Sequence, residues 1–96
     1  MQKTARVLLF ASLKELAGRE EFHLAFSKPC SLKEFASLLR GVLPEHVWRK
    51  IFKDNGDLND GVLLFLNKCL VPHERSQTLL IPPEAEVAFA PLASGG

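Results

Sequence analysis

An uninterrupted apolar run near the start of the chain, Val7-Leu8-Leu9-Phe10, constrains the fold more than any other feature. Four apolar residues without polar alternation are typical of a strand that is covered on both faces. The run therefore predicts a central strand over residues 3–11. A second run, over residues 62–66, predicts another buried strand. Because the sequence has 96 residues, these strands fit one domain with one core.

Two further strands are predicted where apolar and polar residues alternate, over residues 21–26 and 86–90. This period of two is typical of a strand with one buried face. Residues 69–71, which lie just before Pro72, predict a short edge segment. The first two strands are expected to form an antiparallel pair.

The main helix is predicted after Ser31-Leu32-Lys33-Glu34, which has the form of a capping box. The apolar stripe Leu32, Phe35, Leu38 and Leu39 gives this helix one buried face, and Gly41 is a candidate for its C-terminal stop. Residues 12–18 predict a short helical turn that ends at Gly18. Pro44 suits the first turn of a second, shorter helix.

This order of elements predicts an α+β fold with one sheet, for which the β-grasp is a compact solution; the exact ubiquitin-like topology depends on the family resemblance described below. The first and last strands would lie side by side and parallel in a mixed sheet of four to five strands, with the main helix across one face. Residues 1–91 would form the single domain, and residues 92–96 a flexible tail. The predicted core comprises Val7, Leu9, Phe22, Leu24, Phe35, Leu38, Leu39, Leu64, Leu66, Val87 and Phe89.

Composition argues against several partners and compartments. The formal net charge is +1 and no segment concentrates Lys or Arg, so no nucleic-acid partner is expected. No apolar run has the length of a membrane span, and the run after Arg6 is too short for a secretory signal. Cys30 and Cys69 are interpreted as small buried or half-buried thiols in a reducing cytoplasm.

No catalytic or metal-binding motif stands out in the sequence. His23, His46 and His73 are scattered and are interpreted as surface histidines. The aspartates of residues 54–60 lack the spacing of a calcium loop and are interpreted as turn residues. We therefore expect no metal, no bound cofactor and no catalytic acid or base within the chain.

The most unusual local feature is the Gly95-Gly96 pair that follows Ser94. Glycine has no Cβ, so a Ser-Gly-Gly segment can lie extended in a channel that is too narrow for other residues. A tail of this kind would carry the Gly96 carboxylate into the active site of a partner. The folded domain would then serve as a handle, and the reaction would belong to the partner.

Several segments resemble the MoaD/ThiS family of ubiquitin-like sulfur carriers, which includes the small subunit of molybdopterin synthase. The similar segments cover residues 10–18, 54–58, 62–67, 78–79 and 86–91, together with the terminal Gly95-Gly96. Their order and spacing extend over nearly the whole chain. Where family members have an Asp-Gly-Asp-Glu turn before the last strand, this chain has Pro83-Glu84-Ala85-Glu86.

The resemblance implies that Gly96 is the reactive residue. An E1-like adenylating enzyme would activate its carboxylate with ATP and magnesium, and a persulfide donor would convert it to a thiocarboxylate. In the molybdopterin case, the large subunit of the synthase would receive the tail and transfer the sulfur. Ser94 and Gly95 would then lie in the partner's channel. Partner contacts are expected at Phe10, with Lys14 at its rim, and at Pro91 and Leu92.

Four functions remain open on the sequence alone. The first is a sulfur carrier for molybdopterin synthesis, and the second is a sulfur carrier for thiamine, tRNA thiolation or another sulfur-containing product. The third is a ubiquitin-like modifier whose Gly96 is joined to lysines of target proteins. The fourth is a β-grasp interaction module whose Gly-Gly end carries no reaction.

Overall fold

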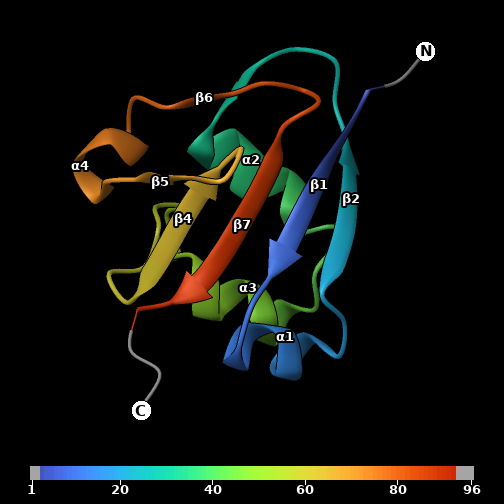
Figure 1. The fold of residues 1–96 in the computed structure, drawn as a ribbon, viewed down its shortest axis with the longest axis vertical. Coiled ribbons are helices and arrows are strands. Elements are labelled where there is room, and N and C mark those ends of the chain that lie inside the picture. Colours follow the sequence, from blue (N-terminus) through green and yellow to red (C-terminus); the bar gives the residue numbers. More distant parts are fainter. Residues whose placement is uncertain (1–2, 93–96) are drawn as a thin grey trace.

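The computed structural model describes residues 3–92 as a mixture of strands and short helices (Figure 1). The elements are β1 (Thr4–Leu9), α1 (Ser12–Ala17), β2 (Glu21–Ala25), β3 (Cys30–Ser31), α2 (Leu32–Leu39), α3 (Glu45–Ile51), β4 (Val62–Leu66), β5 (Cys69–Val71), α4 (His73–Ser76), β6 (Leu80–Ile81) and β7 (Glu86–Pro91). None of the helices in residues 3–92 has the length and apolar character needed to cross a bilayer.

The main sheet has five strands in the order β2-β1-β7-β4-β5. Its two middle neighbours, β1 and β7, are parallel, and Val7 lies opposite Val87. Every other pair in this sheet is antiparallel. The first and last strands thus lie side by side in the middle, as predicted, and the fold is a β-grasp with a mixed sheet.

The helices cover only one face of this sheet. Figure 1 shows α2 and α3 behind the strands, with the other face turned to the viewer. In β1, Val7 and Leu9 are fully buried, whereas Leu8 is half-buried and Phe10, just after the strand, is 38% exposed. The prediction that this strand is covered on both faces is therefore wrong. Its outward apolar residues form part of an open surface.

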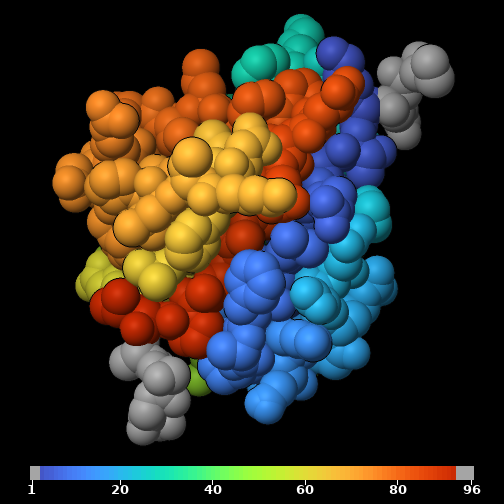
Figure 2. Space-filling model, viewed as in Figure 1, coloured from blue at the N-terminus to red at the C-terminus, as the bar shows by residue number. Residues whose placement is uncertain are grey.

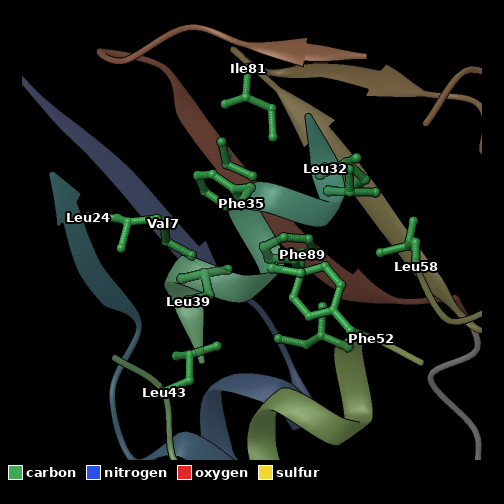
Figure 3. Close-up of a cluster of buried hydrophobic side chains, with 14 of the residues drawn as sticks. Val7, Leu24, Leu32, Phe35, Leu39, Leu43, Phe52, Leu58, Ile81 and Phe89 are labelled. Atoms are coloured by element: carbon green, nitrogen blue, oxygen red, sulfur yellow. The ribbon is translucent and has the colours of Figure 1, made fainter. Parts of the chain in front are cut away.

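The core lies between the sheet and α2. Phe35 and Leu39 of α2 point toward Val7 and Phe89 of the two middle strands (Figure 3). The Trp48 indole N–H of α3 donates a hydrogen bond of 2.7 Å to the Ala36 carbonyl, which satisfies a buried donor and ties α3 to α2.

Two of the predicted helix ends are confirmed. The Glu34 N–H donates to the Ser31 hydroxyl at 3.2 Å, and the Ser31 N–H donates to the Glu34 carboxylate at 2.9 Å, which completes the capping box. Gly18 follows α1 with a φ of 80° and donates its N–H to the Lys14 carbonyl. The stop at Gly41 is wrong, because α2 ends at Leu39 and is capped by Arg40.

Some of the predicted burial is wrong as well. Leu38 is 42% exposed, because it lies on the side of α2 that turns away from the sheet, and Leu66 is only half-buried. Cys69 is exposed because it lies in the edge strand β5. Cys30 is buried as predicted, and its burial raises the pKa of its thiol.

Two features of the structure have no counterpart in the sequence prediction. The strands β3 and β6 pair in a separate two-stranded sheet, in which Cys30 lies opposite Ile81. The short helix α4 follows Pro72 and leads the chain from β5 toward β6.

Candidate docking face

The open face of the sheet carries a continuous apolar patch. One row crosses four strands: Leu8 lies opposite Ala88, Ala88 opposite Phe65, and Phe65 opposite Leu70. The next row toward the end of β7 pairs Ala90 with Leu63. We call this surface, which faces the viewer in Figure 2, the apolar patch; it comprises Leu8, Phe10, Leu63, Phe65, Leu70, Ala88 and Ala90.

A shallow hollow of about 340 Å³ lies within the apolar patch. It is lined by Phe10, Phe65, Lys68, Glu86, Ala88 and Ala90. The two alanines of β7 and the two phenylalanines supply its apolar lining. An apolar concavity of this kind on a protein surface is typical of a site that meets a partner.

The chain leaves the sheet at the border of this patch. After Ala90, Pro91 lies opposite Val62 and is half-buried, and the Leu92 N–H donates to the Gly61 carbonyl at 2.8 Å. The Leu92 side chain is 60% exposed. The last strand therefore delivers the C-terminal segment on the Ala90 side of the hollow, whereas Lys68 and Glu86 line the hollow toward the start of β7.

The structure locates only some of the residues that the sequence analysis singled out. Phe10 lies in the apolar patch, and its N–H donates to the Phe89 carbonyl at 3.1 Å. Lys14 lies on α1 with its ammonium 3.5 Å from the Glu20 carboxylate, and it does not line the hollow. Ser94, Gly95 and Gly96 fall outside the described residues, as does most of the predicted tail.

The part of the open face around the start of β7 is charged, and it shares Glu86 with the hollow. Arg6 of β1 lies between two carboxylates, 3.1 Å from Glu21 on β2 and 3.2 Å from Glu86 on β7. The His23 Nε2 atom is 2.9 Å from Glu21. The hydrogen bond from Arg6 lowers the pKa of the Glu21 carboxyl, and the same bond raises the pKa of Arg6. We call these four residues the charged cluster.

Sequence reasoning missed most of this surface. Leu63 and Phe65 lie in the run that was predicted as a buried strand, and Ala88 and Ala90 lie on the outward side of the alternating strand 86–90, so neither pair was predicted to join Phe10 in one surface. The available signal was apolar character at both parities, which indicates either double coverage or an exposed apolar face. Only the one-sided placement of the helices decides between these two.

The histidines and acidic residues support no metal site in the part of the chain that the structure describes, since no three of the His, Cys, Asp and Glu side chains there form a metal-binding group. His23 and His46 are exposed, as expected. The surface interpretation of His73 is wrong: it is half-buried, and its Nε2 lies 2.9 Å from the Val62 carbonyl.

Comparison with known proteins gives a match only at the level of structure. No family model matches the sequence, and neither does any curated protein. The crystal structure of SAMP1 from Haloferax volcanii is 23% identical, with 97% of this chain and 99% of that chain covered and a TM-score of 0.72. The small archaeal modifier protein 1 of Methanosarcina acetivorans is 22% identical (100% and 99% covered, TM-score 0.72), and Urm1 from Trypanosoma brucei is 17% identical (99% and 97% covered, TM-score 0.76). The fold is that of SAMP1 and Urm1. The match extends over nearly the whole length of this chain and of those three chains.

Proposed function

We propose that this chain is a ubiquitin-like carrier whose Gly96 carboxylate is activated by an E1-like adenylating enzyme. The observation that carries the proposal is the geometry at the end of β7: the chain leaves the sheet beside an open apolar patch and continues to Gly95-Gly96. A partner bound on that patch would have the tail within reach of its active site. The resemblance to the MoaD/ThiS family and the fold shared with SAMP1 and Urm1 support the same proposal.

In this mechanism, the folded domain binds and positions while the partner catalyses. The activating enzyme joins the Gly96 carboxylate to the AMP moiety of ATP, with magnesium, and releases pyrophosphate. The terminal sulfur of a persulfide displaces AMP, and a second thiol then cleaves the S–S bond to leave a thiocarboxylate. Docking holds the Gly96 carboxylate beside ATP, so that the two react as positioned groups and not after a random encounter. The folded domain would raise the rate of adenylation in this way.

The finer proposal is that the sulfur passes to molybdopterin. The large subunit of molybdopterin synthase would dock on the same apolar patch and receive the tail. The order and spacing of the segments that resemble molybdopterin synthase small subunits support this choice. Sulfur transfer to thiamine, tRNA or another product would use the same tail chemistry with a different acceptor enzyme.

A second candidate function is protein modification. Two of the structures with this fold are named small archaeal modifier protein 1. In this function the activated Gly96 would form an amide with a lysine of a target protein. Protease digestion of cell lysate that leaves a Gly-Gly remnant on lysines distinguishes the two outcomes, because sulfur transfer produces no such remnant.

Variants of the tail test the proposal directly. Deleting Gly96 moves the carboxylate by up to about 3.5 Å along an extended chain, and a displacement of even about 1 Å can reduce the rate roughly a hundredfold. Gly95→Val adds a branched side chain in the channel. Both variants, and a protein with one alanine appended after Gly96, should keep the wild-type stability and lose ATP–pyrophosphate exchange with the E1-like enzyme of the same organism.

The intact mass of the protein isolated from cells supplies the matching control. It establishes whether the mature chain ends at Gly96, and it detects the exchange of one oxygen for sulfur. If the truncated or extended protein were activated at the wild-type rate, the carrier function would be wrong and an interaction module would become the leading interpretation.

A further inference from the structure

The turn between β4 and β5 holds a lysine in a backbone conformation that favours glycine. Leu66 lies opposite Cys69, so Asn67 and Lys68 form a two-residue hairpin loop. Both loop residues have positive φ, 49° at Asn67 and 72° at Lys68. Tight hairpin loops with two left-handed residues strongly prefer Asn-Gly, because glycine has no Cβ to clash there. Lysine at the second position therefore works against local stability.

The neighbouring strand fixes the position of this turn. The Asn67 N–H donates to the Glu86 carbonyl at 2.8 Å, and the Asn67 side-chain oxygen accepts from the Glu86 N–H at 2.9 Å. These two bonds join the turn to the first residue of β7. They account for the left-handed conformation of Asn67, whose side chain is used structurally. They do not account for a lysine at position 68.

The Lys68 side chain lines the hollow of the apolar patch together with Phe10 and Phe65. In Figure 2 the gold segment between β4 and β5 extends across the red strand β7 toward blue β1. A lysine in this place can lay its methylene stem along apolar surface while its ammonium stays in water. The side chain is therefore a wall of the hollow as well as a charge at its rim.

The Lys68 ammonium has no ion-pair partner within residues 3–92. Lys68 makes none of the ion pairs in that part of the chain, whereas Glu86, the other charged residue of the hollow, is paired with Arg6 at 3.2 Å. Lys14, the other lysine near Phe10 in sequence, is paired with Glu20. The hollow is thus an apolar depression lined by one lysine that has no ion-pair partner among residues 3–92, and by one carboxylate, Glu86, that shares Arg6 with Glu21.

We propose that Lys68 is a specificity-determining residue beside the apolar patch. The partner inserts an apolar side chain into the hollow and places a carboxylate against the Lys68 ammonium. This inference rests on the proposed function, since the partner is the activating enzyme. A strained backbone position that the fold does not need is a sign of function. Charges at the rim of an interface mainly set which partner binds and how fast.

Because glycine is the favoured residue at this position, Lys68→Gly separates function from folding. The variant should unfold at the same or a higher urea concentration than the wild type, since it relieves the left-handed strain. Its affinity for the E1-like enzyme of the same organism should nevertheless fall about three- to tenfold, and that of Lys68→Glu about tenfold further, as expected for loss and reversal of an interfacial charge. Lys68→Arg should retain binding.

Salt dependence and a distant lysine supply the controls. The affinity of the wild type should decrease with added salt more steeply than that of Lys68→Gly, because the variant has lost one charge pair. Lys28→Glu makes the same change in net charge as Lys68→Glu, in the loop between β2 and β3, away from the hollow. It should bind like the wild type.

The possible results separate this inference from the function on which it rests. Unchanged affinity and salt dependence in Lys68→Gly, or an equal loss in Lys28→Glu, would overturn the role of Lys68 while wild-type adenylation left the carrier function intact. A wild-type protein that the enzyme neither binds nor adenylates would reject both.

Discussion

The two faces of the central sheet differ in what their apolar residues do. Along β1 and β7, one parity packs against α2 and is fully buried, as at Val7 and Phe89. The alternate residues of these strands face away from the helices. Their apolar side chains line a hollow that extends to Ala90, next to where the chain leaves the sheet. Apolar residues of the same strands thus stabilise the fold on one face of the sheet and form the proposed docking surface on the other.

The largest expected effect tests this contrast with two phenylalanines joined by a backbone hydrogen bond. Phe89→Ala should lower the free energy of unfolding by about 3–5 kcal/mol, because Phe89 is fully buried and its loss leaves a cavity. Phe10→Ala should cost about 1 kcal/mol or less, since Phe10 is already 38% exposed. Urea unfolding of both variants measures the difference.

Binding supplies the other half of this test. Phe10→Ala should weaken binding to the activating enzyme although it folds, because the side chain lines the hollow. If Phe10→Ala were as destabilising as Phe89→Ala, Phe10 would be a core residue and the contrast between the faces would be wrong. Wild-type affinity in a folded Phe10→Ala protein would place the docking surface elsewhere.

A smaller contrast comes from two consecutive leucines of α2. Leu39 is fully buried, whereas Leu38 is 42% exposed. Leu39→Ala should cost about 2–5 kcal/mol, and Leu38→Ala should change stability by less than about 1 kcal/mol. The same unfolding experiment serves both. A loss below about 0.5 kcal/mol for Leu39→Ala would remove Leu39 from the core.

Local chemistry explains which parts of the fold were predictable. The capping box at Ser31 and the left-handed stop at Gly18 depend on residues within one turn of each other, so the sequence specifies them. The parallel pair of β1 and β7 was expected from packing rules together with the family resemblance, since the pattern alone indicates only an α+β fold with one sheet.

The errors arise where distant contacts decide the outcome. A helical stripe that includes both Leu38 and Leu39 is wider than the face that α2 buries, and only its placement on the sheet selects Leu39. The pairing of β3 with β6 joins two-residue strands about fifty positions apart, which no local pattern indicates. In the candidate site, Phe10 was predictable as an apolar residue of the first strand, whereas the position of Lys68 depends on a left-handed turn for which lysine gives no signal.

The smallest expected effect concerns the charged cluster near the start of β7. The hydrogen bond from Arg6 lowers the pKa of the Glu21 carboxyl in the folded state. A lowered pKa contributes stability that is present above the unfolded-state value of about 4.3 and is lost as the pH falls through the folded-state value. The stability advantage of the wild type over Glu21→Gln should therefore shrink as the pH falls below the unfolded-state pKa of about 4.3. Both side chains of the pair are substantially exposed, so solvent and salt limit the effect.

Urea midpoints measured from pH 7 to pH 3 test this prediction. Glu74→Gln is the control, because Glu74 makes none of the ion pairs within residues 3–92. A difference that stayed constant across that range, or one equally large in the control, would show that the Arg6–Glu21 pair contributes nothing specific to the fold.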